Sequence, residues 1–267
     1  MENGRVVFLP SLSFPLTLEE KSYLRPDCVD LKGKSVKYSP ANKKLWGLAK
    51  KETPEILAAM LERYSKNANS LITALFPGYA PALVTGNTSY RPVEADDRIQ
   101  SRRHDDRLLH VDAFPSRPVR GERILRVFTN INPNGEGRNW RVGEPFADVA
   151  ARFLPRIPAP FPGSAKLLKL LKITKGIRTA YDHYMLGLHD KMKLDTDYQK
   201  KVKYTAITFP PGSSWIVFSD QVSHAAMSGQ YALEQTFALP VSAMSRPETS
   251  PLKVLEGIKG RSLCQYL

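Results

Sequence analysis

Apolar and polar residues alternate most regularly between residues 123 and 132. Successive side chains of a strand point to opposite faces, so this segment predicts a strand. One face would carry Leu125, Val127, Thr129 and Ile131, and the other would carry Arg126, Phe128 and Asn130. Further short strands are predicted at 82–85, 89–93, 108–114, 204–209, 214–218 and 231–239.

Helical patterning is clearest over residues 53–76, where apolar residues recur at three- and four-residue spacing and Pro54 suits the first turn. A basic helical insert is predicted at 145–203, and the Pro-rich residues 1–40 predict an irregular N-terminal arm. Many short strands, with helices clustered before and inside them, are typical of a closed or sandwiched antiparallel sheet. We therefore expect an α+β fold and a single domain over residues 1–267.

Length and composition agree with one soluble domain. A chain of 267 residues can bury one sizeable core, and 42% hydrophobic residues is ordinary for a globular protein. No apolar run approaches the 18 or more residues that a membrane span needs. The two cysteines, Cys28 and Cys264, provide neither a disulfide framework nor a zinc site, so we expect a cytoplasmic protein.

The formal net charge of +13 indicates a polyanionic partner. Residues 151–203 hold twelve Lys or Arg against four Asp, and within them residues 165–172 place apolar and basic residues on different sides of a short helix. Such a helix can lie in an anionic membrane interface. Equally, it can cover the core with its lysines outward. The segment alone does not decide between the two.

Three residues form a candidate metal site. His110 and Asp112 lie in the apolar run 108–114, where side chains two apart on a strand share a face, and His224 follows another apolar run. Two His and one carboxylate are the ligand set of non-haem Fe(II) sites, which leave the opposite coordination face open. The alternative is chance, because His104 and Asp106 repeat the His-x-Asp pattern in a charged run typical of a solvated loop.

Several longer segments carry a more specific resemblance. They are 110–118, 121–128, 140–146, 181–190 and 218–229. These segments resemble the bacterial hydroxylases of 3-deoxy-D-manno-oct-2-ulosonic acid (Kdo), which belong to the Fe(II)/2-oxoglutarate dioxygenases. The resemblance implies a double-stranded β-helix, a jelly-roll or cupin-like core, with flanking helices and a helical insert.

The same resemblance implies the chemistry. Fe(II) would be held by His110, Asp112 and His224, with 2-oxoglutarate and O2 as co-substrates. The reaction would hydroxylate C3 of Kdo on Kdo-lipid A, giving Ko during lipopolysaccharide inner-core biosynthesis. The enzyme would then be cytoplasmic and peripheral to the anionic surface of the inner membrane.

The anchor for the far carboxylate of 2-oxoglutarate departs from the common pattern, because residues 225–239 contain no Lys or Arg. A buried dicarboxylate needs a charged partner, and Arg126 is the best substitute, with Asn130 on the same strand face and Gln235 assisting from a later strand. Alternatively, Arg126 pairs with a surface acid.

Arg-rich loops suit an anionic glycolipid. Eight Arg lie between residues 98 and 126. The substrate-binding candidates are Arg117 and Arg120, then Arg103 and Arg141. For any single one, a salt bridge to a neighbouring acid is an equally good interpretation. We interpret His183 and His189, six residues apart on a predicted helix, as structural, and Trp140 and Trp215 as core residues.

Two other functions stay open. One keeps the chemistry but changes the substrate to a nucleic acid or a protein side chain, although no aromatic-rich platform for single strands accompanies the Arg. The other is a non-enzymatic cupin-like module that binds sugars or membranes. We expect no nucleic-acid partner and predict no protein partner.

Overall fold

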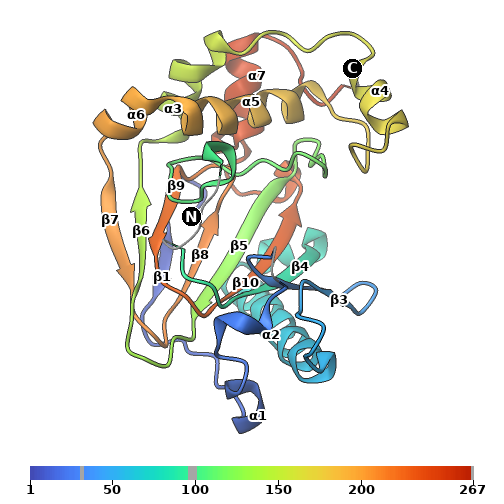
Figure 1. Ribbon diagram of the computed structural model, residues 1–267. Helices are drawn as coiled ribbons and strands as arrows, with labels where there is room; N and C mark the ends of the chain where they lie inside the picture. Colours follow the sequence, from blue (N-terminus) through green and yellow to red (C-terminus); the bar gives the residue numbers. More distant parts are fainter. Residues whose placement is uncertain (31–32, 96–100, 266–267) are drawn as a thin grey trace.

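Two antiparallel β-sheets face each other in the computed structural model, which describes residues 1–30, 33–95 and 101–265 (Figure 1). The larger sheet has the order β1 (Val7–Leu9), β8 (Ser214–Phe218), β5 (Arg123–Asn130), β10 (Ala232–Leu239), β4 (Val84–Arg91), β2 (Val36–Ser39) and β3 (Lys44–Trp46). The smaller sheet has the order β7 (Thr205–Phe209), β6 (Arg138–Val142) and β9 (His224–Ser228). The predicted sandwich of short antiparallel strands is therefore present.

An aromatic cluster fills the space between the sheets. Phe128 of β5 and Trp215 of β8 stack with their ring centroids 5.1 Å apart, and Trp140 and Phe209 close the cluster from the smaller sheet. Phe128 points inward, as its alternation with Val127 predicts, and Val127 packs on the opposite side of β5. The facing of β5 is thus confirmed.

Helix α2 (Pro54–Leu75) covers the outer face of the larger sheet, close to the predicted range 53–76 (Figure 1). Its buried stripe includes Leu57, Met60 and Leu61, and Pro54 begins the helix. The sheet is therefore buried on both faces over its central strands.

Most of the remaining helices gather at one end of the sandwich, the top of Figure 1. Those between β6 and β7 are α3 (Phe146–Phe153), α4 (Ser164–Leu170), α5 (Ala180–Leu194) and α6 (Thr196–Lys201), and α7 (Pro251–Lys259) follows β10. Helix α1 (Leu18–Lys21) lies near the N-terminus. Short 3-10 segments occupy Pro26–Cys28, Pro77–Ala82, Arg102–His104, Leu154–Arg156, Val241–Ala243 and Pro247–Thr249.

Three local predictions were wrong. The strands expected at 82–85 and 89–93 are one strand, β4, because Gly86 lets the backbone of Thr236 approach closely and the sheet accommodates the irregularity without a break. The arm at 1–40 is not irregular throughout, since it contributes β1 and β2. The segment 108–114 is not a strand and forms only a single-residue bridge at His110.

Candidate metal centre

The two candidate histidine ligands are paired through their backbones. His110 N donates to His224 O at 3.0 Å, and His224 N donates to His110 O at 2.9 Å. Directly opposed residues of an antiparallel pair project to the same side, so both imidazoles point the same way. Two residues later, Asp112 N donates to Ser219 O at the end of β8. Residues 110–112 therefore cross from the smaller sheet to the larger one, and this is why they do not continue as a strand.

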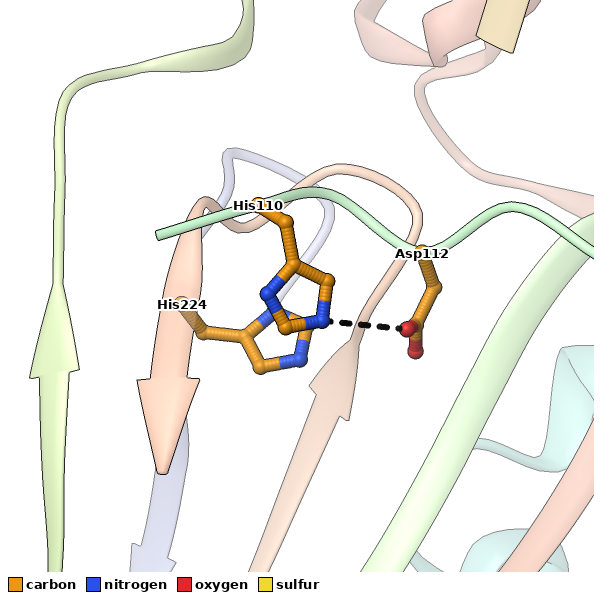
Figure 2. Close-up of side chains that lie close together, drawn as sticks. All are labelled: His110, Asp112 and His224. Carbon is orange, nitrogen blue, oxygen red and sulfur yellow. Dashed lines mark ion pairs between the residues drawn. The ribbon is translucent and has the colours of Figure 1, made fainter. Parts of the chain in front are cut away.

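The three side chains converge at this crossing, as Figure 2 shows. One ligand atom from each of His110, Asp112 and His224 lies within 4.8 Å of the others. His110 Nε2 is 3.7 Å from Asp112 Oδ1. The predicted cluster is thus brought together in space.

Hydrogen bonds fix which nitrogen of each ring can bind a metal. His110 Nδ1 lies 2.7 Å from Leu108 O, and His224 Nδ1 lies 2.8 Å from Val222 O. A carbonyl oxygen only accepts, so each Nδ1 carries the proton and each Nε2 keeps a lone pair directed at the cluster.

The electrostatic environment favours neutral histidines and an ionised Asp112. Burial lowers the pKa of His224 and lowers that of His110 strongly, and in His110 the neighbouring ring of His224 adds to the effect. For Asp112, burial alone would raise the pKa, but Arg126 and the two histidines bring it below its usual value. Neutral imidazoles beside an ionised carboxylate are the donor set that Fe(II) requires, so these residues fit the metal.

Arg126 of β5 joins the metal cluster to a second buried carboxylate. Its Nη2 lies 3.0 Å from Asp112 Oδ2, which accepts no hydrogen bond from any described residue, and its Nη1 lies 2.9 Å from Glu234 Oε1. Arg126 therefore pairs with two carboxylates of the protein, and these lie inside the fold instead of being the surface acid of the alternative interpretation.

The charge network extends beyond Glu234. Arg91 of β4 lies 2.6 Å from Glu234 Oε2 and 4.0 Å from Asp106, and Lys193 of α5 lies 3.8 Å from Asp106. Burial alone would raise the pKa of Asp106, but the charge of Arg91 and of other neighbouring basic groups keeps this pKa below its usual value. Alternating charges thus form a continuous chain that ends at the metal ligand Asp112.

A cavity of about 150 Å³ opens beside the cluster. Its walls include all three candidate ligands, Arg91 and Asp106. The remaining lining comprises Arg126, Phe128, Arg138, Trp140 and Ala226. The indole of Trp140 stacks on the His224 ring with the centroids 5.1 Å apart, and Trp140 and Trp215 both belong to the core, as predicted.

Comparison with known proteins identifies the family. A family model described as 3-deoxy-D-manno-oct-2-ulosonic acid (Kdo) hydroxylase matches residues 1–262. The chain belongs to this family. A comparison with curated protein sequences gave no significant match.

Solved structures of the Kdo hydroxylase KdoO, a non-heme Fe(II) alphaketoglutarate dependent dioxygenase, are similar to the chain. KdoO in complex with alphaketoglutarate and Fe(III) is 50% identical with a TM-score of 0.94, covering 98% of this chain and 88% of that one. The cobalt(II) complex is 50% identical with a TM-score of 0.96, covering 99% and 89%. The predicted family, the jelly-roll fold and the enzyme class of a non-haem iron, 2-oxoglutarate-dependent dioxygenase are confirmed.

Two predicted cofactor residues of this Kdo hydroxylase lie away from the metal cluster. Asn130 donates to the carbonyls of Glu136 and Phe209 and holds the turn after β5. Gln235 bonds to Thr88 and to the backbone of β4, on the sheet face opposite the cavity. The physical reason in the second case is register: a shift of one residue along β10 changes the face, so Glu234 points inward instead.

The predicted substrate-binding arginines are dispersed. Arg103 pairs with Asp190 at 3.2 Å, and Arg141 stacks on Tyr204, on the face of β6 opposite Trp140. Arg117 and Arg120 are exposed and follow Asp112 closely along the chain. Arg98, from the same Arg-rich stretch, lies outside the described residues.

Sequence reasoning missed several neighbours of the site. Asp106 sits in the run interpreted as a solvated loop, yet it lines the cavity. His189 packs edge-on against His110, with the ring centroids 5.3 Å apart, although its spacing from His183 gave no indication of this. Only Glu234 carried a usable signal, since a lone acid on a buried strand must find a cationic partner.

Proposed function

We propose that this Kdo hydroxylase adds a hydroxyl group to C3 of a Kdo residue carried on lipid A, giving Ko in the lipopolysaccharide inner core. The convergence of His110, Asp112 and His224 at a cavity walled by cations carries the proposal. KdoO has been crystallised with alphaketoglutarate and with succinate, and we assign Fe(II), 2-oxoglutarate and O2 to this chain on the same basis.

The chain's own residues divide the work at the centre. His110, Asp112 and His224 would hold the iron from one side, leaving the opposite face for co-substrates. When bound, the iron supplies oxygen activation, which couples replacement of a C–H bond by C–OH to conversion of 2-oxoglutarate into succinate and CO2. The carbonyls of Leu108 and Val222 keep both rings oriented throughout.

Arg138 is the better candidate for the far carboxylate of 2-oxoglutarate. Arg126 already directs both terminal nitrogens at Asp112 and Glu234. Arg138 lines the same cavity from β6, two residues from Trp140, which stacks on His224. Two residues along a strand span about 7 Å, which suits a diacid whose other end reaches the metal. Arg138 Nη1 donates to Gly229 O, and this bond orients the guanidinium.

Arg91 and Arg126, which line the cavity, and cations that interact with them electrostatically suit the sugar carboxylate. Burial and then Arg91 lower the pKa of Lys37 on β2, Glu234 opposes them, and Arg126 and Arg117 add to the lowering, so these charges act on one another. Guanidinium groups bind carboxylates and phosphates well. Among the four predicted substrate residues, Arg117 therefore has the most support, and Arg120 lies close to it in the chain.

We further propose that the enzyme works at the cytoplasmic face of the inner membrane. Within the described residues, no helix combines the length and apolar character that a bilayer span demands. The net charge of +13 would attract the protein to anionic lipid.

Mass spectrometry tests the reaction directly. Purified protein is incubated with Kdo-lipid A, Fe(II) and 2-oxoglutarate in air, and the expected product has gained one oxygen on the Kdo residue. A parallel incubation without 2-oxoglutarate should give no product. Succinate release with no change in the glycolipid would show that the substrate is wrong, and a hydroxyl group at another carbon would overturn the C3 assignment.

A further inference from the structure

Exposed apolar side chains are concentrated around α4. Five of the thirteen exposed large apolar residues in the described chain fall within residues 161–173: Phe161, Leu167, Leu170, Leu171 and Ile173. Phe161 is 81% exposed and Leu170 is 78% exposed. Such a concentration on a soluble protein marks an interaction surface.

The apolar residues of α4 form a stripe on the side opposite the protein. At 100° per residue, Leu167, Leu170 and Leu171 share one face. Ala165 is buried and Leu168 half-buried, and both lie on the other face. The stripe therefore does not cover the core, which removes the interpretation that these leucines are core residues.

Positive charge surrounds the stripe without any acidic residue. Lys166, Lys169, Lys172 and Lys175 are all exposed, and no Asp or Glu occurs from residue 149 to residue 181. Exposed leucines among lysines match the boundary of an anionic bilayer, where apolar groups enter the acyl region and lysines meet headgroup phosphates. A protein partner would instead require acidic groups arranged for this one surface.

The segment after α4 is fastened to the chain that carries a metal ligand. Lys175 N donates to Ser116 O at 2.8 Å, and Arg178 donates to Pro115 O. Ser116 is four residues from Asp112, and the exposed Arg117 comes next. A contact made by α4 would thus be held close to the cations proposed to meet the sugar.

We propose that residues 161–173 form a membrane-docking element that inserts Phe161, Leu167, Leu170, Leu171 and Ile173 into an anionic lipid surface. This inference rests on the proposed function, because docking there would present the glycolipid's sugar to the metal centre. The lysines supply attraction to the headgroups, and the apolar stripe supplies retention.

Vesicle co-sedimentation with the full chain tests the element apart from catalysis. The vesicles contain equal parts of phosphatidylglycerol and phosphatidylethanolamine and no Kdo-lipid A, with phosphatidylcholine vesicles as the comparison. The variant carries Leu170→Glu and Leu171→Glu. The matched control is Leu18→Glu on α1, since Leu18 is also strongly exposed. We expect the paired variant to lose vesicle partition by at least about tenfold and the control to bind like the parent.

Two results would overturn the docking element. One is vesicle binding by the paired variant that equals binding by the parent protein. The other is a parent that self-associates through the stripe and becomes monomeric on substitution without ever binding vesicles. Hydroxylation of a deacylated Kdo-containing saccharide should be equal in parent and paired variant. A parent protein that hydroxylates neither this saccharide nor Kdo-lipid A would count against the proposed function and leave the vesicle result standing.

Discussion

The backbones of His110 and His224 form a reciprocal pair of hydrogen bonds, which places two imidazoles from distant parts of the chain side by side. This pairing is an isolated bridge at the end of β9, next to the cavity. Because the backbone sets the spacing of the rings, the metal cluster needs only one further side chain, Asp112, to be complete. Substitutions at or around Asp112 should therefore act on the metal with little effect on the fold.

Replacing Asp112 with Ala should abolish iron binding at neutral pH and reduce 2-oxoglutarate decarboxylation to the level of the metal-free protein. The carboxylate is the only acid in the cluster, while its backbone bond to Ser219 survives the change. Iron content after anaerobic loading and the thermal midpoint provide the two measurements. Asp148→Ala, an exposed acid on α3, is the control and should behave as the parent. Full iron occupancy in Asp112→Ala would show that Asp112 is not a metal ligand.

Replacing Arg126 with Met should weaken Fe(II) binding by roughly 10- to 100-fold, the usual effect of removing a group that orients a ligand. Without the guanidinium, the negative charges of Glu234 and Asp112 are no longer separated by the positive charge of Arg126. Asp112 also loses the cation that keeps its pKa low. Anaerobic Fe(II) titration gives the affinity. Unchanged iron affinity with a raised KM for 2-oxoglutarate would instead support the sequence-based expectation that Arg126 anchors the co-substrate.

Replacing Arg138 with Met should raise the KM for 2-oxoglutarate about 10- to 100-fold, because a charge-assisted contact contributes roughly 1.5–3 kcal/mol. Iron affinity should stay close to that of the parent, since Arg138 lines the cavity from β6 and its Nη1 donates to Gly229 O, which is not a metal ligand. Succinate formation at increasing 2-oxoglutarate concentrations measures the change. A KM equal to that of the parent would exclude Arg138 as the anchor.

Replacing Asp220 with Ala should lower the free energy of unfolding by about 3–5 kcal/mol, because it leaves a buried Arg without its counter-charge. Arg123 and Asp220 are both almost fully buried, and Arg123 Nε donates to Asp220 Oδ2 at 2.8 Å. This pair also fixes the turn that leads from Ser219 to His224. Urea denaturation measures the loss, with the exposed Asp27→Ala as a control that should leave the midpoint nearly unchanged.

The sequence predicted those parts of the site that depend on local spacing. The interval between His110 and Asp112, and the alternation that turns Arg126 and Phe128 inward, are properties of a short extended segment. The structure turns Phe128 inward and brings His110 and Asp112 together, although residues 108–114 form a single-residue bridge in place of the expected strand. His224 joins them through that bridge between distant segments, which local spacing does not specify.

Features that depend on tertiary pairing could not be predicted in the same way. Gln235 and Glu234 differ by one position, and only the register of β10 against β5 decides which of them faces the cavity. His189 approaches His110 from a helix whose placement no periodicity specifies. The exposure of Leu170 likewise depends on which face of α4 meets the protein.

Isotope labelling tests the central claim most directly: that His110, Asp112 and His224 serve oxygenation of Kdo. Kdo-lipid A, Fe(II) and 2-oxoglutarate are incubated with the protein under oxygen gas of the heavy isotope, and the products are analysed by mass spectrometry. The account predicts one heavy oxygen on C3 of the sugar and one in succinate, with neither formed by Asp112→Ala. Unlabelled product, or labelled product from Asp112→Ala, would contradict it.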